Sequence, residues 1–304
     1  MSAKFEMKLA CGPAPLTVAQ ALQEGAASLS RAGVESARLD AELLLAEALN
    51  FERSRLYLDH GMALDPRAGE RFRSLLSRRV GGEPVAYISG RREFWSLDFL
   101  VTRAVLVPRP ETELLVEVAV GLVETEFQTA GRRLQMMDLG TGSGAIAVAL
   151  AREISDVEIW ATDVSLEVLQ VAQANARRHG VEEKIRFLSA DLFEPVRARG
   201  FFQMIVSNPP YVRRREFDSL VREVRDFEPR VGLDGGPDGL DFYRRIIPQA
   251  QFHLAAGGFI ALEIGADMGA EVTRLFADAG GYSHARVYRD YAGRDRVVSA
   301  RKLA

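Results

Sequence analysis

The sequence has little cysteine and histidine, and this scarcity excludes several kinds of site. Cys11 is the single cysteine in 304 residues, so the chain has neither an intrachain disulfide framework nor a cysteine cluster for zinc. The histidines lack the spacing of metal ligands, and we interpret them as surface or packing residues: His60, His179, His253 and His284. We therefore expect chemistry that needs no metal.

Long apolar runs and a strong net charge are also missing. No apolar run reaches the roughly 20 residues of a membrane helix, and the N-terminus lacks a basic-then-apolar signal pattern. We therefore expect a cytoplasmic protein with no membrane contact. The net charge of −3 argues against binding to nucleic acid through bulk charge, although a local basic patch stays possible.

The first part of the chain predicts a small helical bundle over residues 1–83. Apolar residues recur there at helical spacing, as in the segment that carries Leu39, Leu43 and Leu44. Thr17 with Gln20 forms a capping-box pattern at the start of one helix. This region contains no group of residues typical of a catalytic site. Its helical pattern alone also does not show whether the domain recognises a partner.

A short connecting segment follows over residues 84–108. Apolar and polar residues alternate in it around turn signals, which predicts a β-hairpin linker. We expect its aromatic residues, Phe94, Trp95 and Phe99, to pack rather than to touch a substrate.

Residues 109–304 predict an α/β domain built on a mainly parallel sheet. Short apolar runs alternate with helical segments, and an antiparallel hairpin closes the chain. The expected strands before that hairpin are residues 134–139, 157–163, 185–191, 201–207 and 258–265. Ligands bind outside the carboxyl ends of strands in such sheets, and the unusual residues of this sequence lie at those ends.

A glycine-rich turn follows the first strand. The segment comprises Gly140, Thr141, Gly142, Ser143 and Gly144, directly after Asp138. Such glycines allow backbone to approach a ligand closely at the start of a helix. Asp163 ends the second strand, 21 residues after Gly142, and its carboxylate is able to accept hydrogen bonds from both ribose hydroxyls of an adenosine. Asp191 ends the third strand, where an adenine ring would lie.

These residues alone leave more than one function open. Gly140-x-Gly142-x-x-Ala145 with Asp163 also fits the dinucleotide fingerprint, so a nicotinamide dehydrogenase is a rival. The glycines are also compatible with a tight turn that binds nothing. The arrangement Asp138-x-Gly-x-Gly, taken together with the residues at the end of the fourth strand, decides between a dehydrogenase, a turn that binds nothing and another adenosine-binding enzyme.

The fourth strand ends in Asn208-Pro209-Pro210-Tyr211. A proline keeps the residue before it extended and has no N–H, so this segment cannot join a helix or a sheet ladder normally. It offers two stiff acceptors, the Asn208 side-chain oxygen and the Pro209 carbonyl. They suit a planar –NH2 group, whose weakly nucleophilic nitrogen can be held toward an electrophile without a strong base. Tyr211 can supply an aromatic wall against that group and a nearby cation.

An adenosine cofactor that carries a cationic electrophile, facing an amide-like nitrogen, indicates S-adenosylmethionine. The sequence DLGTGSGAIAVAL followed by SNPPY resembles the class I methyltransferases that act on amide or amino nitrogens. More narrowly, the chain resembles the HemK/PrmC family from about residue 35 to the C-terminus. The motifs that carry this resemblance are GRREFWSLDF, LVPRPETELLVE, DLGTGSG, IVSNPPYV, FEPR and RDYAGRDRVV.

The resemblance implies a fold, a reaction and a partner. The fold would be a Rossmann-like, seven-stranded, mainly parallel sheet with a C-terminal antiparallel hairpin, preceded by a small helical bundle. The reaction would be methylation of N5 of the glutamine in the GGQ loop of class 1 peptide chain release factors, which the helical domain would contact away from the active site. The cofactor would be S-adenosylmethionine, and S-adenosylhomocysteine would be the product.

The resemblance also assigns residues. Gly140 to Gly144 and Asp163 would hold the cofactor, and Asp191 with Leu192 would lie beside the adenine, Leu192 giving apolar contact where some relatives have an aromatic residue. Asn208 and the Pro209 carbonyl would hold the glutamine amide in a slot shaped by Pro210 and Tyr211. Thr112 and Glu113 would close over the methionine end of the cofactor, although a helix cap explains Thr112 equally well.

Three alternatives remain at this point. A methyltransferase of a ribosomal-protein glutamine would share the motif and the fold. A DNA or RNA amino-methyltransferase would use the same acceptors on a flipped base, but it would need a clustered basic face. A non-catalytic binding module would keep the fold without the chemistry. The long segment between Tyr211 and Gly257 is typical of a binding loop or a lid.

Overall fold

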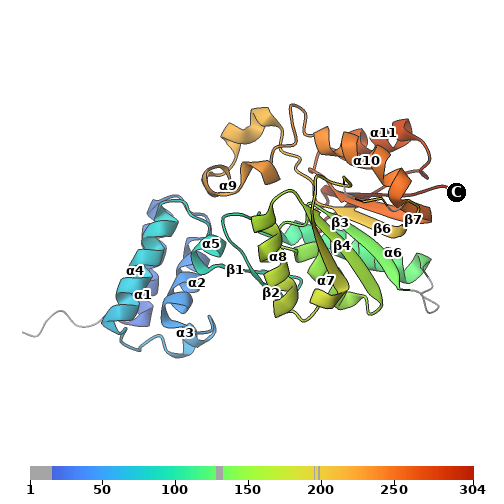
Figure 1. Ribbon diagram of the computed structural model, residues 1–304. Helices are drawn as coiled ribbons and strands as arrows, with labels where there is room; N and C mark the ends of the chain where they lie inside the picture. Colours follow the sequence, from blue (N-terminus) through green and yellow to red (C-terminus); the bar gives the residue numbers. More distant parts are fainter. Residues whose placement is uncertain (1–15, 128–132, 195, 198) are drawn as a thin grey trace, which may run out of the picture. The chain divides into compact units, whose positions relative to one another are not determined.

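The computed structural model describes residues 16–127, 133–194, 196–197 and 199–304, and Cys11 lies outside them. The chain divides between Ser89 and Gly90 into two compact units (Figure 1). No helix in these described ranges is both long and apolar enough to cross a membrane.

The N-terminal unit is helical. Its helices are α1 (Val18–Arg31), α2 (Ala37–Leu49), α3 (Arg55–Leu58), α4 (Pro66–Val80) and α5 (Val85–Ser89). The expected capping box of α1 is confirmed, because the Gln20 N–H donates to the Thr17 hydroxyl and the Thr17 N–H donates to the Gln20 side chain. A Cβ at Gly25 would come within 2.7 Å of the Phe72 ring, so this glycine lets α1 pack closely against α4.

The second unit is built on a mixed sheet. In the described part of the chain the sheet has seven strands in the order β5-β4-β3-β6-β7-β9-β8, with β9 antiparallel to both its neighbours. The strands are β3 (Leu134–Leu139), β4 (Val157–Asp163), β5 (Ile185–Ser189), β6 (Phe202–Ser207), β7 (Leu254–Glu263), β8 (Arg286–Arg289) and β9 (Asp295–Arg301). The first five of these pair in parallel, so their carboxyl ends meet at one edge of the sheet.

Helices cover both faces of this sheet. One face carries α6 (Glu113–Glu126), α7 (Ala145–Glu153) and α8 (Leu166–Arg178), and the other carries α10 (Asp241–His253) and α11 (Gly269–Ala279) (Figure 1). Successive strand residues point to opposite faces. Met136 therefore lies in the core beneath α6 and α7, and Met137 lies in the core beneath α10 and α11. Both are fully buried, which explains why the strands read as continuous apolar runs.

A β-hairpin, β1 (Arg91–Phe94) with β2 (Leu97–Leu100), begins the second unit. Its two turn residues, Trp95 and Ser96, both have φ near +55°, a region that costs non-glycine residues about 1–2 kcal/mol each. The turn is held by two carboxylates. The Trp95 N–H donates to Glu113 over 2.7 Å, and its indole N–H donates to Glu153 over 2.6 Å. Phe94 and Phe99 are buried in the core, in line with the expected packing role.

Asn175 of α8 joins the hairpin to the glycine turn. Its side-chain oxygen accepts from the Leu100 N–H at 2.7 Å, and its amide donates to the carbonyls of Leu100 and Ser143 at 2.9 and 2.8 Å. The side chain is fully buried, so each of these polar groups depends on the others for a partner.

We expect Asn175→Ala to lower the free energy of unfolding by about 2–4 kcal/mol, because it removes the partner of three backbone groups, the buried Ser143 carbonyl and the two partly buried groups of Leu100. Urea unfolding followed by tryptophan fluorescence measures this effect, since both tryptophans, Trp95 and Trp160, belong to the second unit. Gln173→Ala on the same helix is the matched control and should change stability by less than about 0.5 kcal/mol. Equal stability of the Asn175→Ala and control variants would show that the hydrogen bonds of Asn175 contribute little to the free energy of unfolding.

Candidate active site

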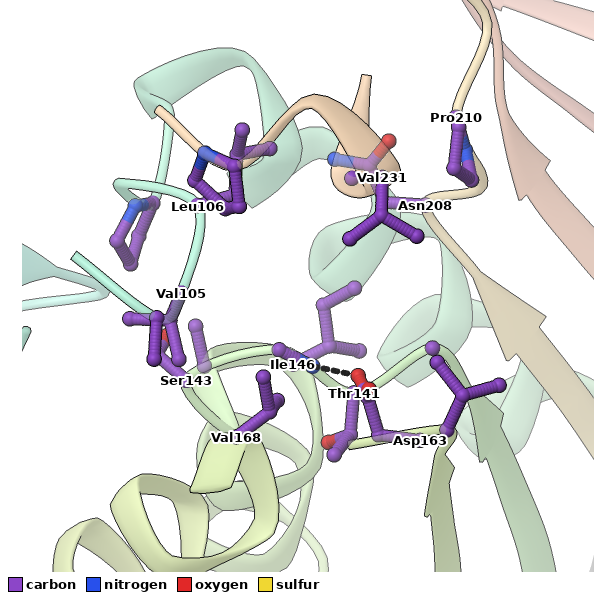
Figure 2. Close-up of a pocket in the computed structure, with 18 of the residues that line it drawn as sticks. Val105, Leu106, Thr141, Ser143, Ile146, Asp163, Val168, Asn208, Pro210 and Val231 are labelled. Atoms are coloured by element: carbon purple, nitrogen blue, oxygen red, sulfur yellow. Dashed lines mark hydrogen bonds between the residues drawn. The ribbon is translucent and has the colours of Figure 1, made fainter. Parts of the chain in front are cut away.

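A pocket of about 320 Å³ opens beyond the carboxyl ends of β3, β4, β5 and β6. In Figure 2, Asn208 and Pro210 lie across this pocket from Ser143 and Asp163. The predicted site residues that line the pocket are Gly140, Thr141, Gly142, Ser143, Asp163, Asp191, Leu192, Asn208 and Pro210. The remaining three, Gly144, Pro209 and Tyr211, are not among the residues that line it.

The glycine turn presents backbone to the pocket. Gly140 and Gly142 have φ of +68° and +56°, and a Cβ at either position would meet no protein atom within 4 Å. The space beside them is therefore open to a ligand. Gly144 has a different reason to be glycine, because a Cβ there would lie 3.1 Å from Ala172 and would push α7 away from α8.

Asp163 stands at the end of β4, beside this turn. Its carboxylate accepts hydrogen bonds from the backbone N–H groups of Gly142 and Ser165, both at 3.2 Å. Burial raises the pKa of Asp163 above its usual value, and these backbone donors counteract part of the increase. The pocket therefore offers an oriented carboxylate next to bare backbone, which suits the ribose of an adenosine.

Asp138 lies beneath the turn and does not reach the pocket. Its carboxyl group is fully buried and accepts a hydrogen bond from the Thr141 hydroxyl at 2.7 Å. Burial, together with a smaller contribution from the nearby charge of Asp163, raises the pKa of Asp138 to about 7, although the hydrogen bond from Thr141 opposes the increase. We infer that Asp138 fixes the shape of the turn through Thr141.

Asp191 and Leu192, which follow β5, combine an ion pair with a strained backbone. Asp191 binds Arg245 over 2.6 Å at the edge of the pocket. Leu192 is buried against the pocket with φ of +54°, in the left-handed region where a leucine is strained. Its side chain gives the pocket an apolar surface, to which Ile146 and Val168 also contribute.

The end of β6 places Asn208 and Pro210 on the pocket wall, while Pro209 is buried. Tyr211 packs in the core cluster beneath α10, and burial raises the pKa of its hydroxyl above the ordinary value. Two glycines allow the following loop to lie against it. A Cβ at Gly235 would be 2.7 Å from the Tyr211 Cα, and one at Gly239 would be 2.5 Å from the Tyr211 carbonyl oxygen.

Thr112 contacts the Asn208 side chain. The Asn208 amide nitrogen, Nδ2, donates to the Thr112 hydroxyl oxygen over 3.2 Å. Thr112 occupies the N-cap position of α6 but makes no side-chain cap bond, so the capping interpretation of its hydroxyl is wrong. Glu113 points instead to the β1–β2 turn, where it accepts from Trp95.

Two loops distant in sequence form the remaining wall: residues 104–109 before α6 and residues 229–232 from the long segment after Tyr211. The buried Glu228 carboxylate joins them, because it binds Arg109 and accepts from the Val107 N–H at 3.3 Å. Arg109 and Val231 both line the pocket.

The sequence reasoning missed the partners of the predicted residues. Glu263 carries a recognisable signal, because it is the last residue of β7, as Asp163 is of β4, and Asp138 and Asn208 lie within one residue of the ends of β3 and β6. Glu228 belongs to the FEPR motif, whose sequence alone does not indicate a role for the acid. Asn175 and Arg245 lie within helices and have no local signal.

The fold and the pocket define a class I S-adenosylmethionine-dependent methyltransferase. The antiparallel β9 is inserted between β7 and β8, unlike the strand order of dinucleotide-binding domains. This confirms the predicted fold class and removes the dehydrogenase rival. Two family models match the chain: "PrmC N-terminal domain" over residues 20–90 and "Methyltransferase small domain" over residues 116–224.

Close relatives cover nearly the whole chain. A release factor glutamine methyltransferase of Moorella thermoacetica is 43% identical over 94% of this chain and 98% of its own length. Another, of Koribacter versatilis, is 41% identical over 94% of this chain and 99% of its own length. The chain belongs to the release factor glutamine methyltransferase family.

A solved structure of a release factor-specific protein-(glutamine-N5) methyltransferase from Alicyclobacillus acidocaldarius is 29% identical. It covers 65% of this chain and 95% of its own, with a TM-score of 0.40. The family assignment rests on the sequence relatives and not on this structural likeness.

Proposed function

We propose that this chain transfers the methyl group of S-adenosylmethionine to the side-chain amide N5 of the glutamine in the GGQ motif of class 1 peptide chain release factors. The observation that carries the proposal is the position of Asn208. It lies on the pocket wall at the end of β6, across from the glycine turn, and two prolines follow it. The choice of a release factor as the substrate follows from the family to which the chain belongs.

The residues of the pocket fit the cofactor. The open backbone at Gly140 and Gly142 would accommodate its methionine portion, and Asp163 would accept hydrogen bonds from its ribose hydroxyls. Leu192, Ile146 and neighbouring apolar side chains would enclose the adenine, with Asp191 at its edge. When bound, S-adenosylmethionine supplies a methyl group on a positively charged sulfur, which needs no metal to react.

Asn208 and Pro209 would hold the glutamine. The Asn208 oxygen, Oδ1, and the Pro209 carbonyl would accept the two N–H bonds of the substrate amide. This directs the nitrogen lone pair out of the amide plane, and the amide loses one proton to solvent as the methyl group is accepted. Pro210 and Tyr211 would shape the slot. The contribution is positional and electrostatic, and it requires no strong base.

The partner is a protein, and we place the reaction in the cytoplasm, where peptide chains are released. We assign recognition of the release factor away from its GGQ loop to the helical domain of residues 1–83. The sequence predicts a linker at residues 84–108 before a methyltransferase domain of residues 109–304, but the chain divides between Ser89 and Gly90, with α5 in the first unit and the β1–β2 hairpin in the second. The net charge of −3 gives no support to a nucleic-acid partner.

Mass spectrometry of purified release factors, incubated with this protein and isotopically labelled cofactor, tests the proposed function. We expect a single added methyl group on the glutamine of the GGQ loop, formed equally well in the presence of EDTA. Labelling of a ribosomal-protein glutamine, or of nucleic acid, with the release factors left unmodified would refute the proposal.

We expect Asn208→Ala to lower kcat by about 10²–10³-fold, because it removes one acceptor that positions the reacting nitrogen. The affinity for S-adenosylhomocysteine should change little. Gln203→Ala, at the opposite end of β6, is the matched control and should keep kcat within about two-fold. Single-turnover methylation and calorimetric titration separate the two quantities, and unchanged turnover in Asn208→Ala would exclude the mechanism.

Asp163→Ala should act on cofactor binding instead. Losing two charge-assisted hydrogen bonds to the ribose should raise the dissociation constant of S-adenosylhomocysteine about 100-fold. Glu167→Ala places the same change at an exposed carboxylate on α8 and should leave the affinity intact. If both variants bind the cofactor product as wild type does, Asp163 does not hold the ribose.

A further inference from the structure

Residues 213–232 form a loop whose two ends lie side by side. The Val212 N–H donates to the Leu233 carbonyl at 2.9 Å, and the Gly235 N–H donates to the Val212 carbonyl at 3.0 Å. These backbone bonds fix a neck at which the 213–232 loop leaves the body of the second unit and returns to it. A loop held in this way can move as one piece about its neck.

The 213–232 loop has almost no core of its own. The structure describes all of its residues, and Glu228 is the single buried one among them. The loop contains α9 (Arg222–Phe227), which has no buried residue and lies apart from the helices that cover the sheet (Figure 1). A segment with so few buried apolar contacts opens at a lower free-energy cost than the sheet does.

Glu228 attaches the 213–232 loop to the rest of the second unit. Its carboxylate pairs with the guanidinium group of Arg109 and accepts a hydrogen bond from the Val107 N–H at 3.3 Å. Both partners belong to residues 104–109, which line the pocket. The one buried attachment of this loop is therefore a charged side chain that reaches across to another loop.

The two loops that Glu228 joins form the wall opposite the glycine turn. Pro229 and Val231 line the pocket from the 213–232 loop. In Figure 2, Leu106 and Val231 lie across the pocket from Thr141 and Asp163. A cofactor held by the glycine turn would thus be enclosed by this wall, and movement of the 213–232 loop would uncover it.

An ion pair is a readily reversed attachment. The desolvation of two buried charges offsets much of their attraction, and both charges regain water when the pair separates. We therefore expect the closed and open positions of the loop to differ little in free energy, so that contacts of a bound cofactor with Pro229 and Val231 decide between them. Burial raises the pKa of Glu228, and the charge of Arg109 opposes this increase and favours the ionised carboxylate.

We propose that Glu228 is a positioning residue that latches the 213–232 loop against residues 104–109 and so closes the pocket over the bound cofactor. Separation of Glu228 from Arg109 then opens the pocket. Each turnover requires this opening, because one S-adenosylmethionine must enter and one S-adenosylhomocysteine must leave. The inference rests on the proposed function for its cofactor, and it does not depend on which protein is methylated.

The dissociation rate of S-adenosylhomocysteine tests the latch. Radiolabelled S-adenosylhomocysteine bound to the full-length protein is chased with excess unlabelled compound, and the retained label is followed over time. Glu228→Gln removes the charge but keeps the shape, and it should raise this rate about 10–100-fold, the effect of losing a hydrogen bond to a charged group. Asp218→Asn is the matched control at an exposed acid of the same loop and should keep the rate within about two-fold. A wild-type rate in Glu228→Gln would overturn the proposal.

Arg109 itself lines the pocket, so its role in the latch must be separated from a direct contact with the cofactor. Arg109→Gln leaves the Glu228 charge buried without its partner, and it should also raise the dissociation rate about 10–100-fold. The double variant Glu228→Gln/Arg109→Gln should stay within about three-fold of the faster single variant, because both changes break the same pair. Effects that multiply in the double variant would show two independent roles and contradict the latch.

Hydrogen exchange measured by mass spectrometry reports the opening of the loop without any turnover. In wild type, saturating S-adenosylhomocysteine should slow amide exchange across residues 213–232 about ten-fold or more, and both single variants should lose most of this protection. A wild-type loop whose exchange does not respond to S-adenosylhomocysteine would refute the latch. Faster exchange throughout the sheet of Glu228→Gln, with the loop still protected by the ligand, would show that Glu228 only stabilises the fold.

These measurements need only the cofactor product, so they separate the latch from the proposed function. A wild-type protein that closes its loop on S-adenosylhomocysteine but leaves release factors unmodified would refute the function and support the latch. Normal methylation with an unresponsive loop would refute the latch alone. If Glu228→Gln does not fold, exchange in Arg109→Gln decides: lost protection of residues 213–232 supports the latch, and wild-type protection contradicts it.

Discussion

Asn208 ends a buried parallel strand and is followed by two residues that have no backbone N–H. The chain therefore cannot continue the sheet or begin a helix there, and its acceptors are left without partners from their own backbone. The sheet order places β6 beside β3, so this unpaired end faces the same pocket as the glycine turn. The chemistry of the site depends on this placement of acceptors opposite a cofactor cradle.

Buried polar side chains from distant parts of the sequence hold the surrounding loops. Asn175 joins the β1–β2 hairpin to the glycine turn, and Glu228 joins the two loops of the opposite wall. Thr112 joins the start of α6 to Asn208. In each case a charged or amide group satisfies backbone or side-chain partners that would otherwise be buried alone. The pocket thus keeps its shape although most of its lining comes from loops.

The strands, the sheet and the chemistry-bearing ends could be predicted because each depends on local pattern. Continuous apolar runs mark buried parallel strands, and Asp138, Asp163, Asp191 and Asn208 all lie within two residues of the carboxyl ends of such strands. The role of Thr112 could not be predicted, since its position before a helix resembles an ordinary cap. Its partner Asn208 lies 96 residues away, and only the folded sheet brings the two together. The positive φ angles of Trp95 and Ser96 were likewise unforeseen, because the carboxylates that hold them belong to α6 and α7.

The central claim is that acceptors at the end of β6 orient a carboxamide nitrogen toward the methyl donor. A crystal structure with S-adenosylhomocysteine and a peptide containing Gly-Gly-Gln measures this most directly. The glutamine nitrogen should lie within hydrogen-bonding distance of both the Asn208 side-chain oxygen and the Pro209 carbonyl, and it should face the cofactor sulfur. A glutamine held elsewhere, or an Asn208 that presents its –NH2 group to the peptide, would contradict the account.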